Sequence, residues 1–257
     1  MPVILITGAS SGIGAALAQH YAAPGTLLAL NARGADRLEA VAAACRQAGA
    51  EVEARSLDVR DRPAMAAWID DLAARSGLDL VIANAGVNGG HPQGGVETAE
   101  TAHLVLDVNL MGALNVALPS LARMEAAGRG QVALISSLAA FAPLPDAPAY
   151  SGTKAALLAH GLALREKLAP KGVRVNVVCP GYVKTAMGAD YQGWRPLEMS
   201  AEAAARRIAK GLARDEGVIA FPAALAAAAR GAALLPESLR RLGMRGFSFR
   251  MGERQQR

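Results

Sequence analysis

Tyr150 and Lys154 stand four residues apart in the stretch YSGTK. Four residues make just over one helical turn, so on a helix the two side chains would share a face. A free tyrosine has a pKa of about 10, and a neighbouring positive charge stabilises the phenolate and lowers that pKa. The pair therefore suits a tyrosine that gives or takes a proton near neutral pH, provided that other elements bring a substrate to it.

A second stretch that could serve a chemical function is TGASSGIG. It follows an apolar run at residues 3–7 and leads into a helical pattern. Gly8 would permit a tight turn, Gly12 would let the backbone approach a pyrophosphate, and Gly14 would let the helix pack closely on the strand. Phosphates would then lie at the helix N-terminus, where free N–H groups and the helix dipole favour anions. A glycine-rich turn without a ligand is the alternative, and the position directly after a first apolar strand disfavours it.

The composition limits the class of protein. A chain of 257 residues suits one large α/β domain or two small ones, and with 52% hydrophobic residues it is not a disordered chain. Residues 230–257 contain seven arginines and two glutamates, so the net charge of this segment is +5, the same as that of the whole chain. The basic excess therefore belongs to the end of the chain and not to the body. Because aromatic residues are also scarce, we predict no nucleic-acid partner.

Cysteine usage and the first residues indicate a reducing compartment. Cys45 and Cys179 lie far apart, so neither a disulfide framework nor a metal site is predicted. The start, MPVILITGAS, lacks the basic region of a signal peptide, and we expect a cytoplasmic protein. The apolar run 222–236 is shorter than the roughly 20 residues of a membrane span and contains Arg230, so no transmembrane helix is predicted.

These chemical stretches require elements that position them, and the chain alternates short β-rich segments with longer helical ones. The predicted strands are residues 3–7, 26–32, 52–57, 78–84, 130–136, 172–178 and 217–222. The predicted helices are residues 12–22, 34–49, 61–75, 98–127 and 148–169. The strands read as apolar on both faces, which is typical of a buried parallel sheet. Alternating strands and helices predict βαβ units in a doubly wound sheet, without a second domain.

The spacing of the glycines, with three residues and then one residue between them, resembles that of the classical short-chain dehydrogenase/reductase family. The resemblance continues over about residues 3–187. Its further parts are NAG at 84–86, Asn109, SS at 136–137, Tyr150 thirteen residues after Ser137, and PGYVKT at 180–185. Each part alone is weak, and their order and spacing together are specific.

The resemblance implies a fold and a domain organisation. The expected fold is a single-domain Rossmann-type α/β structure, a doubly wound sheet of seven parallel strands in the order 3-2-1-4-5-6-7 with helices on both faces. Residues 1–221 would form the NADP-binding and catalytic domain. Residues 222–257 would form a helical, basic extension of the same domain.

The resemblance also implies hydride transfer between a nicotinamide cofactor and a small-molecule carbonyl or alcohol. Tyr150 would be the general acid/base, and Lys154 would lower its pKa and bind the nicotinamide ribose. Ser137 would hydrogen-bond the substrate oxygen, and Asn109 would hold a water in a proton relay. From the residues alone, a helix cap is the preferred interpretation of Ser137, and a helix-interior polar group with a local bond is the preferred interpretation of Asn109.

The end of the second predicted strand distinguishes between the two nicotinamide cofactors. Ala32 stands where NAD-using relatives carry an acid, and Arg33 stands where NADP-using relatives carry a base, so NADP(H) is predicted over NAD(H). Ser11 is a departure, because many NADP-using relatives have a lysine or arginine there. The full set implied for the cofactor is Gly8, Ser10, Ser11, Gly12, Ile13, Gly14, Arg33, Asp58, Val59, Asn84, Ala85, Gly86, Tyr150, Lys154, Pro180, Gly181, Val183 and Thr185. In this set Asp58 would lie near the adenine amino group and Thr185 near the nicotinamide amide or phosphate.

The substrate is less defined than the cofactor. The pocket is expected from residues 88–95, 138–148 and 187–199, which favour an uncharged, moderately hydrophobic ketone, aldehyde or secondary alcohol. Arg195 is the one arginine considered for a substrate carboxylate. Two rival functions remain, a non-catalytic NADP(H) sensor and a sugar-nucleotide epimerase of the extended branch. The intact Ser137, Tyr150 and Lys154 disfavour the first, and the short C-terminal part of the chain disfavours the second.

The end of the chain bears on assembly. Many relatives close with a glycine-rich strand end that supports a tetramer, and this chain closes with an alanine-rich helix and a basic end. Residues 148–169 are apolar nearly all round in their middle, so a homodimer is predicted rather than a tetramer. The basic tail could dock on its own body, cover the cleft or lie on an anionic membrane, and docking is the preferred interpretation.

Overall fold

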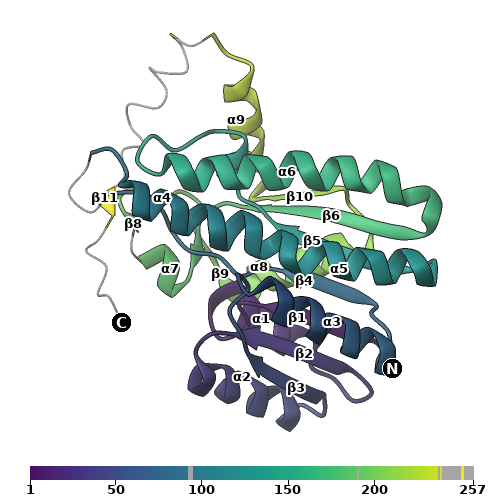
Figure 1. Cartoon of the computed structure of the whole chain (residues 1–257). Coiled ribbons are helices and arrows are strands. Elements are labelled where there is room, and N and C mark those ends of the chain that lie inside the picture. Colours follow the sequence, from purple (N-terminus) through teal and green to yellow (C-terminus); the bar gives the residue numbers. More distant parts are fainter. Residues whose placement is uncertain (92–94, 190, 237, 239–249, 252–257) are drawn as a thin grey trace.

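The computed structural model describes residues 1–91, 95–189, 191–236, 238 and 250–251 of the chain. At its centre lies a sheet of seven parallel strands in the order β3-β2-β1-β4-β5-β6-β10 (Figure 1). The strands are β1 Val3–Thr7, β2 Leu27–Ala32, β3 Glu51–Ser56, β4 Leu80–Ala83, β5 Gly130–Ile135, β6 Val173–Pro180 and β10 Val218–Phe221. Numbered within this sheet alone, the order is 3-2-1-4-5-6-7, so the predicted topology is confirmed.

Helices cover both faces of the sheet. One layer consists of α3 Arg62–Ser76, α4 Ala99–Leu106, α5 Gly112–Ala127 and α6 Pro148–Leu168, and the other of α1 Gly12–Tyr21, α2 Ala35–Gln47 and α8 Ala201–Ala213 (Figure 1). Each layer buries its own apolar cluster against the strands, with Leu17 and Ile208 in one and Trp68 and Val116 in the other. These two cores hold the sheet rigid, so its strand ends are a fixed platform for a site.

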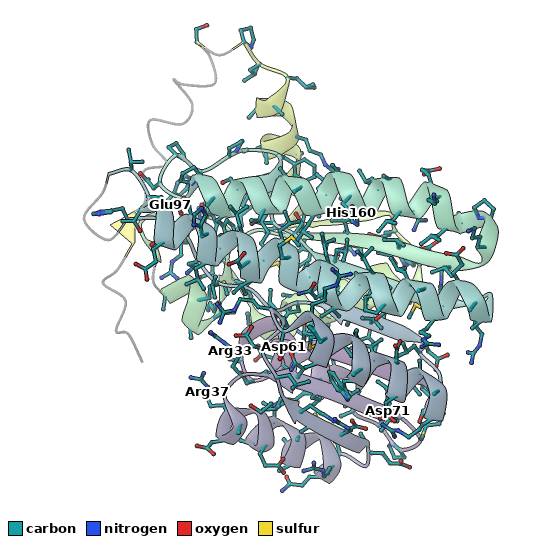
Figure 2. The ribbon with its side chains drawn as sticks, viewed as in Figure 1. Arg33, Arg37, Asp61, Asp71, Glu97 and His160 are labelled. Carbon is teal, nitrogen blue, oxygen red and sulfur yellow. The ribbon has the colours of Figure 1, made fainter. Side chains whose placement is uncertain are left out.

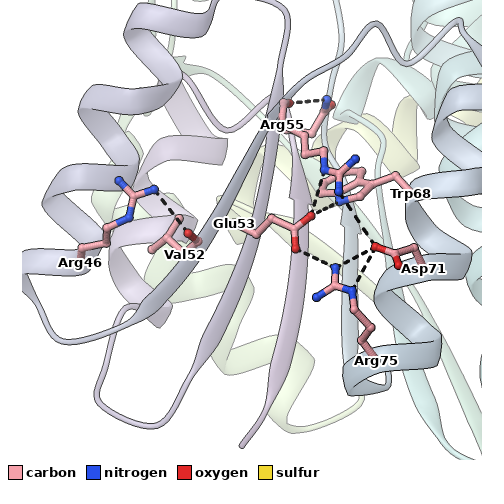
Figure 3. A network of polar contacts seen from close by, with 8 residues as sticks. Arg46, Val52, Glu53, Arg55, Trp68, Asp71 and Arg75 are labelled. Carbon is pink, nitrogen blue, oxygen red and sulfur yellow. Dashed lines mark hydrogen bonds and ion pairs between the residues drawn. The ribbon is translucent and has the colours of Figure 1, made fainter.

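The outermost strand, β3, differs from the prediction. It lies at the edge of the sheet beside β2, and its residues are partly or fully exposed instead of apolar on both faces. Glu53 on this strand accepts hydrogen bonds from the Trp68 indole at 2.6 Å and from Arg75 at 2.9 Å (Figure 3). The charged network ties the open edge to α3, and charges on an edge strand also discourage pairing with another chain.

The predicted single helix over residues 98–127 is interrupted. Between α4 and α5 the chain forms a π-helical turn, η1, over Asp107–Met111. A π-helical turn inserts extra residues into the helix and re-aims the side chains there, and such turns are frequent at functional sites. Asn109, one of the predicted catalytic residues, lies in this turn and is 1% exposed.

The same long helix bears on the prediction that no helix could span a membrane. In the described part of the chain, the run Ala99–Ala127 is long and apolar enough to do so by length and composition, although half of its most apolar window is buried inside the fold. The prediction considered only the run 222–236, where α9 Ala223–Ala233 has 11 residues. The apolar character of Ala99–Ala127 is explained by its packing against the sheet and α3, which a core helix requires.

Smaller elements follow β6. Strand β7, Val183–Lys184, pairs with β9, Met199–Ser200, and the short helix α7, Ala186–Ala189, lies between them in the chain. Strand β8, Tyr191–Gln192, pairs with β11, Arg250–Met251. This last pairing places the backbone of two tail residues on the body, which agrees with the docking interpretation for those residues. The rest of the predicted basic tail lies outside the described residues, apart from its first part through residue 236 and residue 238.

Candidate active site

All seven strands are parallel, so their carboxyl ends lie along one edge of the sheet, and a cleft opens there. Most of the predicted residues line it. They are Gly8, Ser10, Ser11, Gly12, Ile13, Arg33, Asp58, Val59, Asn84, Ala85, Gly86, Ser137, Tyr150, Lys154, Pro180, Gly181, Val183 and Thr185. Gly14 and Asn109 belong to the predicted set but are not among the residues that line the cleft. Each contacts a residue that does, Gly14 with Gly8 and Asn109 with Val87.

The glycine turn has the geometry of a phosphate cradle. Gly8 and Gly12 have φ values of +65° and +56°, a region that glycine adopts readily. A Cβ added at Gly14 would lie 2.2 Å from the carbonyl oxygen of Gly8, so this glycine permits the close approach of α1 to the turn. The N-cap of α1, Ser11, makes no side-chain cap, and the first helical turn has no acidic residue. The N–H groups at this helix end are therefore available to an anion.

Two polar side chains brace this turn from behind. The hydroxyl of Thr7 accepts hydrogen bonds from the N–H groups of Asn84 and Ala85, each at 3.1 Å. The Asn84 amide in turn donates to the carbonyl oxygens of Thr7 at 2.9 Å and Gly8 at 3.3 Å. The side chain of Asn84 thus binds the turn, and these hydrogen bonds join the ends of β1 and β4.

At the other end of the cleft, two guanidinium groups line the same wall. Arg33, as predicted, and Arg37, which the sequence analysis missed, both belong to the lining and are exposed. Figure 2 shows both side chains projecting on the same side of the lower part of the molecule. Arg37 lies in the first turn of α2, four residues after Arg33, and this closeness in sequence was the signal by which it could have been found. Two cations at this position suit a phosphate group.

Asp58 and Asn31 complete this end. Asp58 binds Arg60 through both carboxylate oxygens, and the hydrogen bond from Arg60 holds the pKa of Asp58 below its usual value. Asn31 is 1% exposed, and its amide donates to the carbonyl oxygens of Arg55 and Leu57. Its own oxygen, Oδ1, is buried without a hydrogen-bond partner and belongs to a residue that lines the cleft. A buried acceptor without a donor is costly, so this residue fits a cleft that receives a polar ligand such as a nucleotide.

Tyr150 and Lys154 meet in the middle of the cleft, both on α6. The Lys154 ammonium lies 5.4 Å from the centre of the Tyr150 ring. Burial raises the pKa of the Tyr150 phenol, and a hydrogen bond with Ser137 offsets this only in part. The expectation that Lys154 lowers the pKa of Tyr150 stays a prediction. Lys154 is itself buried, and desolvation lowers its own pKa to about 8.

Lys154 is fixed at both ends of its side chain. Its ammonium donates to the carbonyl oxygen of Ile135 at 2.9 Å, and the Ser136 hydroxyl donates to its backbone carbonyl at 2.7 Å. The thiol of Cys179 lies against the same group, hydrogen-bonded to the Ser136 hydroxyl, and burial raises its pKa to about 11, so it is not a thiolate near neutral pH. Neither Ser136 nor Cys179 was assigned a role from the sequence. In the fold these two residues help to hold α6 against the strand ends, and that role depends on contacts between segments far apart in the chain.

Ser137 and Asn109 both combine a structural and a site position. The Ser137 hydroxyl accepts from the N–H of Ala139 at 3.1 Å and so caps the short helix η2, Leu138–Ala140, while it faces Tyr150. Both ends of the Asn109 amide bind the backbone of Val87, at 2.7 and 2.9 Å. The alternative of a local bond for Asn109 is thus wrong, since Val87 lies 22 residues earlier. Its role in holding a water stays a prediction.

The part of the cleft beyond Tyr150 differs from the predicted pocket. No residue of 138–148 lines it, because Leu138 packs against Cys179 and the helix α9. The loop 187–199 contributes Met187, Gly188, Arg195 and Glu198. Arg195 donates to Glu198 at 2.9 Å, so its charge is already paired and the carboxylate role considered for it is not supported.

Comparisons with known proteins agree with this geometry. A family model described as short chain dehydrogenase matches residues 2–196. An uncharacterized oxidoreductase of Myxococcus xanthus is 36% identical over 236 residues, which cover 91% of this chain and 93% of that protein. A short-chain dehydrogenase from Sphingobium yanoikuyae, solved in complex with NADPH, has a TM-score of 0.78 at 31% identity and covers 100% of this chain and 98% of its own. A bulky-bulky ketone specific alcohol dehydrogenase from Comamonas testosteroni has a TM-score of 0.76 at 26% identity, with coverage of 95% and 91%.

The depressed pKa of Lys154 predicts how stability depends on pH. Between pH 8 and 10.5 the unfolded chain holds a proton on this lysine that the folded chain has released. The free energy of unfolding therefore rises with pH in this window. We expect the difference between wild type and Lys154→Met to grow by about 3 kcal/mol across it, measured by urea denaturation. The exposed Lys210→Met is the control and should show a flat difference; a flat difference for Lys154→Met would contradict the burial argument.

Proposed function

The chain belongs to the short-chain dehydrogenase family, and on that premise we propose that it is an NADP(H)-dependent oxidoreductase that interconverts a carbonyl and an alcohol. One observation carries the proposal. The hydroxyls of Ser137 and Tyr150 and the ammonium of Lys154 meet in the same cleft as the glycine turn. A nucleotide site and a proton donor that share one cleft suit hydride transfer coupled to proton transfer.

The choice of NADP(H) over NAD(H) is supported by the charges at the end of the cleft. Arg33 and Arg37 are two cations that would bind a 2′-phosphate, and Ala32 puts no carboxylate there to repel it. Ser11 does not add the further cation that many relatives have. The similar protein from Sphingobium yanoikuyae was solved with NADPH, which supports the same cofactor.

The nicotinamide ring supplies or accepts the hydride when the cofactor is bound. The residues of the chain handle the proton and the substrate oxygen. The Tyr150 phenol is protonated at neutral pH, since its ordinary pKa is about 10 and burial raises it, so its hydroxyl can donate a proton to a carbonyl oxygen. Ser137 hydrogen-bonds with this hydroxyl and can also donate to the substrate oxygen as negative charge develops there.

Lys154 contributes a cation at a fixed place beside Tyr150. The Ile135 carbonyl accepts a hydrogen bond from the ammonium, and the Ser136 hydroxyl binds the backbone of Lys154. These contacts keep the ammonium beside the phenol when the phenol loses its proton. Asn109 fixes the backbone of Val87, the residue after Gly86. Gly86 lies close to both polar groups, since a Cβ added there would be 3.2 Å from Asn109 Oδ1 and 3.8 Å from Lys154 Nζ. We propose that a water at this place links Lys154 to solvent in a proton relay.

The substrate that fits best is an uncharged, moderately hydrophobic ketone or the matching secondary alcohol. Met187 contributes an apolar surface to the far end of the cleft. Arg195 is paired with Glu198, so these two residues offer no net charge to a charged substrate. The Comamonas testosteroni relative is named for bulky ketones, which supports this class without identifying a compound.

We further propose that two copies of the chain associate through the layer of α4, α5 and α6. This layer exposes large apolar side chains. The elements that carry them lie side by side (Figure 1). The side chains are Leu106 at 39%, Met111 at 50%, Leu118 at 47% and Leu162 at 39% exposure. A group of exposed apolar residues on adjacent helices favours a protein partner, and a second copy is the simplest one.

The first experiment is NADPH consumption, followed by absorbance, over a panel of uncharged ketones and aldehydes, with the reverse reaction on alcohols beside it. Tyr150→Phe should lower kcat by about a hundred- to ten-thousandfold, because the proton donor is lost. NADPH binding, measured by fluorescence, should persist. Activity near wild type in this variant would refute the role of Tyr150. NADPH binding by the wild type without turnover of any compound would favour the sensor alternative.

The cofactor proposal predicts unequal effects of arginine substitutions. Arg33→Ala and Arg37→Ala should each raise the KM for NADPH about ten- to a hundredfold, as expected for a lost charge-assisted contact. The KM for NADH should change little, because NADH has no 2′-phosphate. The exposed Arg62→Ala serves as the control for a general loss of positive charge. Equal effects on both cofactors would overturn the assignment.

The dimer proposal predicts a change of mass in solution. Sedimentation velocity at micromolar concentration should give a dimer for the wild type and a monomer for Leu118→Glu, because a buried unpaired charge opposes the contact. Leu234→Glu changes a residue that is 88% exposed outside this layer, and it should leave the dimer intact. A monomeric wild type, or a dimeric Leu118→Glu, would reject this surface.

A further inference from the structure

The helix that holds Tyr150 begins without a cap of its own. The N-cap residue of α6 is Ala147, whose side chain cannot accept a hydrogen bond, and the first helical turn contains no acidic residue. Pro148, the first residue of the helix, has no N–H group. The first backbone donor of the helix is therefore the N–H of Ala149, directly before Tyr150. An N-terminal donor in a partly buried setting is satisfied by an acceptor from elsewhere in the chain or by water.

Glu97 supplies that acceptor from a distant part of the chain. Its Oε2 accepts from the N–H of Ala149 at 2.9 Å, across 52 residues of sequence. Its Oε1 accepts from the N–H of Gly90 at 2.5 Å. Figure 2 shows Glu97 beside the adjoining ends of α4 and α6. A carboxylate at this place also meets the positive end of the helix dipole, which adds to the stability of the contact.

The surroundings are shaped around this carboxylate. A Cβ added at Gly89 would lie 2.3 Å from Glu97 Oε1, so a side chain there would displace the carboxylate from its present position. On the other side of the helix start, the Ser151 hydroxyl accepts from the N–H of Leu144 and donates to the Ala147 carbonyl. The start of α6 is thus held by Ser151 from its own segment and by Glu97 from the loop after β4.

The same loop also reaches the far end of the cleft. The Asn88 amide donates to the carbonyl oxygen of Met187 at 2.6 Å, and both residues line the cleft. Continuous contacts therefore run from Met187 through Asn88 and Gly90 to Glu97, and on to the residue before Tyr150. Glu97 itself is not among the cleft-lining residues, so it can act on the reaction only through the groups it holds.

We infer that Glu97 is a positioning residue, which caps the catalytic helix from outside and sets where the Tyr150 hydroxyl stands relative to the substrate oxygen. The inference rests on the proposed oxidoreductase function. Without the carboxylate, the Ala149 N–H loses its acceptor and the first turn of α6 is free to shift. A small displacement of a proton donor is enough to slow proton transfer strongly, whereas the glycine turn that binds the cofactor lies on other elements.

The test compares Glu97→Ala and Glu97→Gln with the wild type, using NADPH and a ketone that the wild type reduces. Glu97→Ala should lower kcat about ten- to a hundredfold, with the Kd for NADPH unchanged. Glu97→Gln keeps one acceptor oxygen and should show a smaller loss. The control is Glu100→Ala, which removes an exposed carboxylate three residues later and should keep the activity of the wild type.

The solvent deuterium isotope effect on kcat distinguishes positioning from a loss of folded protein. It should increase in Glu97→Ala, because proton transfer from Tyr150 becomes slower than the other steps. A variant that only lost folded protein would lower kcat with an unchanged isotope effect, and that outcome would overturn the inference. So would a kcat of Glu97→Ala equal to that of the wild type.

Failure of this inference can be told apart from failure of the proposed function. If the wild type reduces no carbonyl of the panel, the proposed function fails first. If the wild type is active and both Glu97 variants match it in kcat and in isotope effect, the oxidoreductase function stands and the positioning role alone is rejected.

Discussion

The burial of Lys154 is the constraint on which the rest of the site depends. A cation inside a protein is tolerated only where fixed acceptors replace water, and the Ile135 carbonyl at the end of β5 provides one. Ser136 binds the backbone of the same lysine, so α6 is joined to the last residue of β5 and to the residue that follows it. Because Tyr150 lies one turn earlier on α6, this junction also determines where its hydroxyl lies. Burial also weakens the charged form of Lys154, so that its pKa falls to about 8.

The two ends of the cleft use charge in different ways. At the end proposed to bind the nucleotide, the N-terminus of α1 and the exposed Arg33 and Arg37 favour anions and remain in contact with water. Around Tyr150, Ser136 and Lys154 are buried, and burial raises the pKa of the phenol. The body of the chain is neutral as a whole, with the net charge in the last residues. The anion site is therefore created by local placement of charge and helix ends, and not by the global charge of the protein.

Backbone contacts between distant segments hold these groups in place. Asn84 and Thr7 join the ends of β1 and β4, and Asn109 holds the backbone after β4 from the π-helical turn. Glu97 joins the same loop to the start of α6. Each of these side chains satisfies backbone groups at the end of a strand or a helix, where regular hydrogen bonding stops. The cleft lies where these ends meet, so the groups that complete the fold also position the site.

The sequence by itself determined the approximate positions of the strands and the glycine turn, because these depend on local pattern, and its resemblance to a known family implied the order of the strands and the set that lines the cleft. It did not reveal that β3 is an exposed edge, that a π-helical turn interrupts residues 98–127, or that residues 138–148 lie away from the cleft. It also missed Arg37 and Glu97, and it did not show that burial raises the pKa of Tyr150. Only the tertiary structure decided these, because burial, desolvation and the partner of a side chain depend on residues that are far apart in sequence and close in space.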